Sequence, residues 1–509
     1  MQVIGIGDNV FDVYENLGIA YPGGNAVNCA VSAARLGAEA SYCGALADDS
    51  WGEVMRASLG SESVDLSLCR TIKGGTTKLV RQERHKGERF FLGVDEGDAW
   101  VPFPKLDADT LVRLRKADVL LSSCNGKVES QLGLLDGHEG ILCFDFGEKE
   151  KYRTEEYFEK VLPHVDLAQF SMPETDDLEV REFLDAWHFV EQGIAVLVTR
   201  GAAAPLFFFQ DKEVRGVPAE GQIATDTMGA GDAFVAALAL CLSRRGWRHG
   251  WTPGTAAEIE ADLTEAGRHA AHMCQRDGGF GHPYRWKRTV RAVIFDLDGV
   301  LVESEPYYVQ QLINLAACHG KAFSQEQIDS IYGSSDEHQL NLLCEVTGES
   351  RDAVECEYNK YLYESPIDYS KVAIAGAEEL LSYLQGNGIH IAVASSSHLA
   401  DIRRALDQTG LARHVDAVAS GFDECHASKP DPAVYRLALE RLGVSPDEAL
   451  IVEDSTYGIQ AGVAAGVDVL CLVKPHGNVD RTGAVLEFDS HDQILGYLDA
   501  VLHPSDRTL

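Results

Sequence analysis

Short runs of apolar residues alternate with longer stretches in which apolar positions recur at helical spacing, through most of the chain. In the first half the apolar runs are QVIGIG, ASYCGAL, DVLLSSC, GILCFDF, VDLAQFS and AVLVTRG, and NAVNCAVSAARLGA predicts a helix. In the second half the strand-like runs are AVIFDLD, HIAVASSS, AVASG, ALIVEDS and VDVLCLV. Strands that alternate with helices are typical of α/β layers. We therefore expect an α/β fold in each half.

Two segments depart from this alternation. Between about residues 74 and 94, TTKLVRQERHKGERFFLGV predicts a hairpin with a Lys-Gly turn, which is a β-flap inserted into the first α/β domain. Residues from about 306 to 370 follow a helical pattern almost throughout and predict a small helical insert. The pattern breaks at the basic segment YRWKRT. We expect domains at 1–283 and 291–509, joined by 284–290, a joint too short to be a flexible tether.

Length and composition limit the class of protein. The 509 residues exceed what one core usually serves, and 45% hydrophobic and 24% charged residues are typical of a globular chain. A net charge of −35 argues against sequence-independent binding to nucleic acid or an anionic membrane. Any phosphorylated substrate then needs a site that is locally positive.

Cysteine spacing and the hydropathy pattern predict the compartment. None of the twelve cysteines forms a C-x-x-C pair, so we expect reduced thiols rather than disulfides or a zinc site. The start, MQVIGIGDNV, lacks the features of a signal peptide, and no apolar run approaches the roughly 18 residues of a membrane span. We expect a cytoplasmic protein that acts on small molecules.

Carboxylates gather at predicted strand ends in the second half. Asp296 and Asp298 are two apart, so their side chains point the same way from an extended strand. Adjacent carboxylates repel each other unless a cation joins them, and Mg²⁺ prefers oxygen ligands. With the ion bound, one aspartate can act as a nucleophile toward phosphorus and the other can transfer a proton. Further polar groups end other predicted strands of this half: Ser395-Ser396-Ser397, Lys429 and Glu453-Asp454.

This order of motifs, D-x-D-G-x-x-x-[ED]-S-E-P, then serine, Lys-Pro and E-D-S, resembles the haloacid-dehalogenase superfamily over about 291–500. The branch with a helical cap, which includes β-phosphoglucomutase and small sugar-phosphate phosphatases, is the most similar. The resemblance implies a Rossmannoid domain whose nucleophile is Asp296 and whose general acid/base is Asp298. It also implies a phosphoryl site formed by Ser395, Ser396 and Lys429, and Mg²⁺ ligands at Asp296, Asp298, Glu453 and Asp454.

Two positions depart from the mutase pattern. Tyr308 stands where the mutases carry a histidine, and Ser334 to Asp336 stand where they carry a basic cap group after Gly333. Without these groups a bisphosphate is harder to hold for a second transfer. We therefore expect hydrolysis, with mutase chemistry as the alternative.

A glycine loop precedes an apolar helix in the first half, within ATDTMGAGDAFVAALAL at 224–240. Gly229, Ala230 and Gly231 let the backbone close around an anion at the helix amino terminus, and Asp232 falls where it can take a proton from a hydroxyl. The alternative is that these residues only cap the helix. Amide and carboxylate side chains suited to sugar hydroxyls lie near the chain start, at Asp12, Gly24, Asn25 and Asn28.

The D-T-x-G-A-G-D and G-G-N-x-x-N motifs resemble the PfkB (ribokinase-like) carbohydrate kinases over roughly 1–283, and IGDNVFDVY with FDFGEK is most similar to the fructoselysine 6-kinase branch. The resemblance implies a three-layer domain with a β-flap lid. It implies that Asp232 activates a sugar hydroxyl toward the γ-phosphate of Mg·ATP, over the anion hole of Gly229, Ala230 and Gly231. The sugar would contact Asp12, Gly24, Asn25 and Asn28.

The nucleotide motifs depart from the family pattern. The usual N-x-x-E appears as Ser171-Met-Pro-Glu174, and Ala204 stands where the last glycine of T-x-G-x-x-G is expected. Thr199 and Gly201 remain for the nucleotide, and Glu174 for the metal. We expect a bifunctional kinase and phosphatase, with a first half that only senses ligand as a further alternative. The sequence names neither sugar and leaves open whether the flap pairs two copies into a homodimer.

Overall fold

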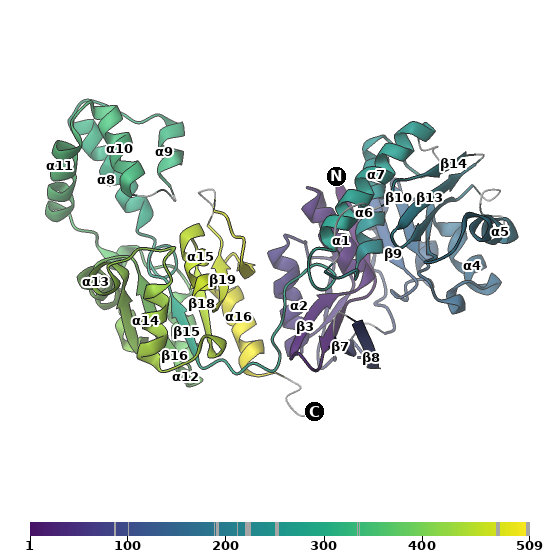
Figure 1. Cartoon of the computed structure of the whole chain (residues 1–509), viewed down its shortest axis with the longest axis horizontal. Coiled ribbons are helices and arrows are strands. Elements are labelled where there is room, and N and C mark those ends of the chain that lie inside the picture. Colours follow the sequence, from purple (N-terminus) through teal and green to yellow (C-terminus); the bar gives the residue numbers. More distant parts are fainter. Residues whose placement is uncertain are drawn as a thin grey trace. The chain divides into compact units, whose positions relative to one another are not determined.

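The computed structural model describes the chain except residues 86–87, 100, 188, 190–192, 211, 219–224, 250–253, 333, 335, 475–478 and 505–509. Figure 1 traces its helices and strands along the chain. It divides into two compact units, Met1–Lys287 and Arg288–Leu502. Within the described residues no helix is long and apolar enough to cross a membrane, and the twelve cysteines there are free thiols.

The first unit is built on an eight-stranded sheet of order β14-β13-β12-β11-β10-β9-β1-β4. The strands from β12 to β4 pair in parallel, and β13 and β14 continue the sheet antiparallel. All six predicted strands of this half are present. Their bounds are β1 (Gln2–Ile6), β4 (Glu39–Cys43), β9 (Val119–Ser123), β10 (Ile141–Asp145), β11 (Leu167–Ser171), β12 (Ala195–Arg200), β13 (Ala203–Phe209) and β14 (Lys212–Arg215).

Helices cover both faces of this sheet. One layer contains α1 (Asn25–Arg35), α6 (Ala230–Arg244) and α7 (Ala256–Met273), which contact one another and the strands. Strand residues such as Ile4 and Phe144 point to the other face, where they form one core with apolar side chains of α3 (Ala108–Lys116), α4 (Glu155–Val161) and α5 (Asp177–Trp187). The predicted three-layer α/β architecture is confirmed.

A second sheet forms the flap. Its order is β3-β2-β7-β8, with bounds β2 (Val10–Tyr14), β3 (Ile19–Gly23), β7 (Leu79–His85) and β8 (Glu88–Asp95). The strand β7 begins later than the predicted flap start at 74, because the backbone N–H groups of Gly74, Thr76 and Thr77 donate to carboxylates instead of to a strand. The predicted Lys86-Gly87 turn lies outside the described residues. The remaining elements are α2 (Ser50–Ser61), β5 (Ala45–Ala47) and β6 (Arg70–Ile72).

The second unit has a parallel six-stranded sheet of order β17-β16-β15-β18-β19-β20. Its bounds are β15 (Ala292–Phe295), β16 (His390–Ser395), β17 (Ala417–Ser420), β18 (Ala449–Glu453), β19 (Asp468–Leu472) and β20 (Ala484–Phe488). The flanking helices are α12 (Ala377–Gly386), α13 (Leu399–Thr409), α14 (Ala433–Leu442), α15 (Thr456–Ala464) and α16 (His491–Leu502).

The predicted helical insert is a cap with a core of its own. It contains α8 (Glu305–Cys318), α9 (Gln325–Ile331), α10 (Asp336–Thr347) and α11 (Arg351–Glu364), packed around residues such as Leu312 and Leu343. Gly333 and Ser335, which the sequence marks as a departure from the mutases, lie outside the described residues. Shorter turns of 3₁₀ or π helix complete the chain: Leu132–Leu135, Glu150–Tyr152, Leu162–His164, Tyr369–Lys371, Leu411–His414, Gly421–Cys425 and Pro446–Glu448.

The expected joint at 284–290 is ordered by contacts made separately with each unit. Tyr284 is buried, exchanges backbone hydrogen bonds with Ala20, and its ring lies 5.1 Å from that of Trp51. Arg288 pairs with Asp468 at 2.7 Å in the second unit. We infer that neither end of this segment behaves as a loose linker.

Candidate active sites

Two helices begin at the carboxyl edge of the first unit's sheet, and each begins after a glycine with positive φ. Gly24 (φ 115°) precedes α1 and Gly229 (φ 73°) precedes α6. A Cβ on Gly24 would lie 2.8 Å from the Asp8 carbonyl oxygen, and one on Gly229 would lie 3.1 Å from Gly279. Glycine therefore permits both tight turns. The first N–H groups of α1, those of Asn25 and Ala26, donate to the Asp8 carboxylate, and the Ala230 N–H of α6 donates to the Thr227 carbonyl at 3.3 Å, so an anion at α6 would meet the N–H groups that follow Ala230.

Asp232 lies in the first turn of α6, after Ala230 and Gly231, and is 6% exposed. Its carboxylate does not cap its own helix. Instead it accepts hydrogen bonds from Asn25 Nδ2 at 2.7 Å and Asn28 Nδ2 at 2.8 Å. Burial, with the nearby charge of Asp145, raises the pKa of Asp232 to about 8 despite these donors. Among the described residues no side-chain cap is present at the start of α6, and the base role of Asp232 stays a prediction.

Acceptor oxygens converge beside Asp232. A Cβ on Gly23 would lie 3.5 Å from Asp12 Oδ2 and 3.7 Å from Asn28 Oδ1, so both oxygens approach one point. Asn28 Oδ1 is buried and has no hydrogen-bond partner among the described residues, while Asp12 Oδ1 accepts from Gln82 Nε2 of the flap at 3.4 Å. Burial raises the pKa of Asp12 to about 7, although the charge of Arg89 opposes this. Such acceptors suit the hydroxyl donors of a sugar.

The flap is tied to the loop that precedes α6. Arg84 on β7 contacts Asp226 at 3.0 Å and Asp277 at 2.6 Å. Asp226 is almost fully buried and also accepts from the backbone of Met228 and Gly278. Strand β2 pairs with β7, which carries Arg84, and β2 also carries Asp12. The flap and the predicted sugar site therefore share one strand. Sequence patterns predicted the hairpin but not this shared strand.

The residues predicted to bind the nucleotide and its metal lie near the carboxyl ends of β11 and β12. Thr199 lies in the last part of β12, where it pairs with Ser171, and Glu174 and Gly201 follow the two strands. Glu174 is exposed at φ 62°, and Gly201 also has φ 62° in the turn after β12. All of these positions lie at the edge that bears Asp145 at the end of β10. Nucleotides bind at this edge in open α/β sheets.

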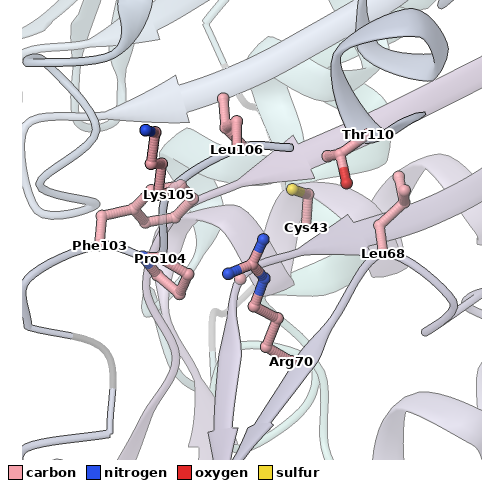
Figure 2. A pocket seen from close by; sticks show the side chains of 9 residues that line it. Cys43, Leu68, Arg70, Phe103, Pro104, Lys105, Leu106 and Thr110 are labelled. Atoms are coloured by element: carbon pink, nitrogen blue, oxygen red, sulfur yellow. The ribbon is translucent and has the colours of Figure 1, made fainter. Parts of the chain in front are cut away.

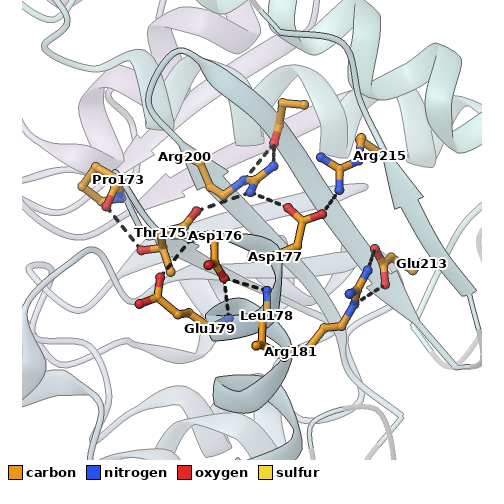
Figure 3. Close-up of polar contacts among 11 residues, drawn as sticks. Pro173, Thr175, Asp176, Asp177, Leu178, Glu179, Arg181, Arg200, Glu213 and Arg215 are labelled. Atoms are coloured by element: carbon orange, nitrogen blue, oxygen red, sulfur yellow. Dashed lines mark hydrogen bonds and ion pairs between the residues drawn. The ribbon is translucent and has the colours of Figure 1, made fainter.

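A buried arginine holds the altered nucleotide loop (Figure 3). Arg200 donates to the Ala204 carbonyl through Nε at 3.0 Å and Nη2 at 2.7 Å, and to Asp177 through Nη1 at 2.7 Å. Asp177 pairs in turn with Arg215. The position where the family pattern expects glycine is thus fixed by its backbone carbonyl. No sequence motif marks Arg200, because its partners are brought to it by the conformation of the turn.

A small cavity of about 10 Å³ lies elsewhere in the first unit (Figure 2). Its lining includes Cys43, Arg70, Phe103 and Lys105, and none of the predicted site residues. Arg70 already pairs with Asp107 at 3.0 Å, so its charge is compensated. The cavity does not form part of the site at the carboxyl edge.

In the second unit a lysine joins two carboxylates. Lys429 Nζ lies 2.5 Å from Asp296 Oδ1 and 2.6 Å from Glu453 Oε1, and all three side chains are buried. Burial opposes the charge on Lys429, but Asp296 and Glu453 raise its pKa well above the ordinary value. The Tyr435 hydroxyl donates to the same oxygen of Glu453 at 2.8 Å. Tyr435 was not predicted, since it lies within α14, six residues after Lys429, at a position that no motif marks.

The second aspartate of the D-x-D pair is held by hydroxyls. Asp298 accepts from Ser304, and from Ser397 Oγ at 3.1 Å. Burial raises its pKa, against these donors. Ser395 ends β16 with Oγ bonded to the Ser397 N–H, and Ser396 Oγ accepts from the Lys429 N–H at 3.4 Å. The serine run and Lys429 therefore meet, as predicted, beside the aspartates.

Asp454 completes a group that fits a divalent cation. Ligand oxygens of Asp296, Glu453 and Asp454 all lie within 4.8 Å of one another. Burial and the charges of Glu453 and Asp296 raise the pKa of Asp454 well above its ordinary value. A Cβ on Gly299 (φ 82°) would lie 1.8 Å from Asp454 Oδ2, so glycine permits this approach. Crowded carboxylates of this kind suit Mg²⁺.

Glu453 is the most constrained member of this group. One of its oxygens accepts from Lys429 and Tyr435, and the other accepts from the N–H groups of Asp454 and Ser455 and from the Ser455 hydroxyl. A cation would compete with these donors for Glu453. The Mg²⁺ role of Glu453 stays a prediction.

Comparison with known proteins matches a family model to each unit. Residues 19–275 match the pfkB family carbohydrate kinase model, and residues 293–472 match the haloacid dehalogenase-like hydrolase model.

Two curated proteins and one solved structure show what each part is similar to. Fructosamine kinase FrlD of Bacillus subtilis is 30% identical over 293 residues, which are 56% of this chain and 95% of that protein. A phosphorylated carbohydrates phosphatase of Thermotoga maritima is 31% identical over 181 residues, which are 35% of this chain and 83% of that protein. The structure of a fructokinase with bound ATP from Xylella fastidiosa is 16% identical with TM-score 0.45, covering 55% of this chain and 94% of that one.

Proposed function

The chain belongs to the pfkB family carbohydrate kinases through residues 19–275 and to the haloacid dehalogenase-like hydrolases through residues 293–472, and from this we propose a bifunctional enzyme that phosphorylates one sugar derivative and dephosphorylates another. The first unit is a carbohydrate kinase and the second a phosphatase. We propose below which compounds the two units act on and which residues take part.

The observation that carries the kinase proposal is the position of Asp232 between Asn25 and Asn28, at the amino termini of two helices. Asp232 takes the proton of a sugar hydroxyl, and the unpartnered Asn28 Oδ1 accepts a second hydroxyl. ATP with Mg²⁺ supplies the phosphoryl group when bound. The N–H groups of Gly231 and Asp232, which follow Ala230 at the start of α6, would stabilise the charge that develops on that group. Thr199, Gly201 and Glu174 hold the nucleotide and its metal.

In the second unit we assign Asp296 as the nucleophile that forms an aspartyl phosphate and Asp298 as the general acid and base. Ser395, Ser396 and Lys429 hold the phosphoryl oxygens. Ser304 and Ser397 keep Asp298 oriented, since both hydroxyls bond to its carboxylate. Asp296, Asp298, Glu453 and Asp454 would hold Mg²⁺, which when bound would neutralise charge on the phosphate.

The two units act on different compounds. If both used one sugar phosphate, the pair would only hydrolyse ATP. The similarity to a fructosamine kinase supports a ketose-linked amine or a related sugar as the kinase substrate. The phosphatase then removes phosphate from a different sugar phosphate, one formed later in the same pathway.

Hydrolysis is favoured over mutase chemistry by the group at position 308. Tyr308 is hydrogen-bonded to Tyr369, and burial raises its pKa far above the ordinary value. The described part of the site thus offers a neutral phenol at this point rather than a basic imidazole. Retention of phosphate on an isomerised product, with no free phosphate, would indicate a mutase instead.

We also propose that the flap forms a homodimer contact. Strand β8 is an edge strand, and its Phe90, Phe91 and Leu92 are 48%, 68% and 55% exposed. Exposed apolar edge strands tend to pair with another chain.

The test uses the Asp296→Asn protein, which retains the kinase but lacks the nucleophile. It is incubated with Mg·ATP and a panel of ketoses, fructosamines and nucleosides, and products are followed by mass. A new phosphosugar establishes the kinase substrate, and adding wild-type protein shows whether the second unit consumes it. ATP binding with no product across the panel would instead favour a sensing first unit.

A further inference from the structure

A cluster of two histidines and an aspartate lies in the first unit, away from both sites. His138 precedes β10, Asp166 precedes β11, and His249 lies in the connection between α6 and α7. They therefore stand at the amino ends of strands whose carboxyl ends carry the kinase site. Their ligand atoms lie within 4.8 Å of one another.

Asp166 stands between the two imidazoles. Its Oδ2 lies 2.7 Å from His138 Nε2, and its Oδ1 lies 2.7 Å from His249 Nδ1. Oδ2 also accepts from the Leu142 N–H at 2.8 Å, and the His249 N–H donates to the Gly140 carbonyl at 2.9 Å. The carboxylate and both rings are thus held in place by the backbone.

Both ring nitrogens of His138 face acceptor oxygens. Its Nδ1 lies 3.3 Å from the Leu135 carbonyl, an acceptor, and its Nε2 faces the Asp166 carboxylate, also an acceptor. A neutral imidazole has one N–H, so either tautomer leaves one nitrogen lone pair facing an oxygen. The ring is 4% exposed, so water does not relieve this conflict. Either a second proton or a metal ion on Nε2 removes it.

We propose that His138, Asp166 and His249 form a binding site for a transition-metal dication, with Zn²⁺ as the best fit. Two imidazole nitrogens and one carboxylate are a ligand set of zinc, whereas Mg²⁺ takes oxygen ligands. The Leu135 carbonyl fixes the tautomer that leaves Nε2 free to bind the metal, as outer-shell acceptors commonly do. His249 is 53% exposed, which gives the ion an entry path and a solvent ligand.

The ion joins the α6–α7 connection to the strands β10 and β11. Helix α6 has 15 residues and is about 22 Å long, and its other end carries Asp232. The metal is therefore too far away to take part in phosphoryl transfer. Its effect is to stabilise the first unit, because the fold brings its three ligands together and the ion therefore binds the folded chain more tightly.

The experiment uses the full chain, cleared of metal with a chelator and kept in excess Mg²⁺ so that the carboxylate site of the second unit is occupied. Co²⁺ is titrated in and its visible absorption recorded, and Zn²⁺ is then used to compete and to shift the thermal midpoint. The variants are His249→Gln, at an exposed ligand, and His138→Gln, at the buried one. His164→Gln is the matched control, because His164 pairs with Asp136 at 2.6 Å in the same unit.

Wild type and His164→Gln should bind one Co²⁺ with the absorption of a four-coordinate site, and Zn²⁺ should raise their thermal midpoint. His249→Gln should weaken binding by at least about tenfold and lose the Zn²⁺ shift. Absence of a four-coordinate spectrum in wild type would overturn the proposal and leave a protonated histidine–carboxylate cluster. Equal binding by His249→Gln and wild type would also overturn it, whether or not His138→Gln folds.

Discussion

Replacing Asp145 by asparagine should move the acid limb of the kinase pH profile to lower pH. The proposed base, Asp232, must be ionised to take a proton, and its pKa is raised to about 8 by burial and then by the charge of Asp145. Removing that charge lowers the pKa of Asp232, so the ionised base persists at lower pH. Asparagine keeps an oxygen for the Gly147 N–H, which now donates to Asp145 Oδ1 at 2.8 Å.

The size of the shift follows from the geometry. Asn25 Nδ2 lies 2.7 Å from an oxygen of Asp232 and 3.5 Å from an oxygen of Asp145, so these oxygens are at most about 6 Å apart. Two charges about 6 Å apart at an effective dielectric constant of about 20 interact by about 3 kcal/mol, or about two pH units. The comparison is best made at about pH 7, because the pKa of Asp145 is itself raised by burial to about 6 and its charge is mostly present above that value. There the ionised fraction of Asp232 should rise from about one tenth to about nine tenths.

The assay is ADP release with the identified sugar at saturating Mg·ATP, measured as kcat/KM against pH in the Asp296→Asn background. Each profile is normalised to its own alkaline plateau, which removes general losses of activity. Glu150→Gln is the matched control, since it removes one charge from the same loop at a side chain that is 87% exposed. An acid limb that stays in place in Asp145→Asn, or that moves equally in the control, would refute the assignment of Asp232 as the titrating base.

Four further outcomes are expected. Lys429→Met leaves two buried carboxylates without their counter-charge, so it should abolish hydrolysis and destabilise the second unit by about 3–5 kcal/mol. Denaturant unfolding measures this change, and unchanged stability would contradict the prediction. Gly299→Ala forces a Cβ against Asp454 at positive φ, so phosphatase activity should fall sharply while ADP release by the kinase continues; loss of both would contradict a local effect. Phe91→Glu on the exposed flap strand should convert a dimer to a monomer by light scattering, and a wild-type monomer would exclude the flap contact. Asp296→Asn should abolish phosphate release from sugar phosphates, and its full retention would exclude the aspartyl mechanism.

Local patterns predicted most of the architecture. A strand such as GILCFDF is almost wholly apolar because both of its faces are covered, so it stands out against amphipathic helices. The site residues in glycine-rich or strand-end motifs were found for a similar reason: Gly24 and Gly299 occupy positions where a side chain would collide with the backbone or a carboxylate. Such constraints leave a signal within a few positions of sequence.

What could not be predicted depends on contacts between distant residues. Asp145 influences Asp232 only because β10 ends and α6 begins at the same edge, and Tyr435 reaches Glu453 from a neighbouring helix. The predicted flap begins too early because side-chain carboxylates satisfy its first N–H groups, which no alternation of hydrophobic and polar residues reveals.

The balance of charge around the lysine between Asp296 and Glu453 bears on the order in which ligands bind at the second site. Four carboxylates, those of Asp296, Asp298, Glu453 and Asp454, gather near the ammonium groups of Lys429 and Lys474, so the cluster carries an excess of negative charge when all four are ionised. A phosphate ester, itself a dianion, is repelled by such a cluster until a divalent cation offsets that excess. We therefore expect ordered addition, with the cation binding first and the ester second. Such an enzyme senses free magnesium before it meets its substrate.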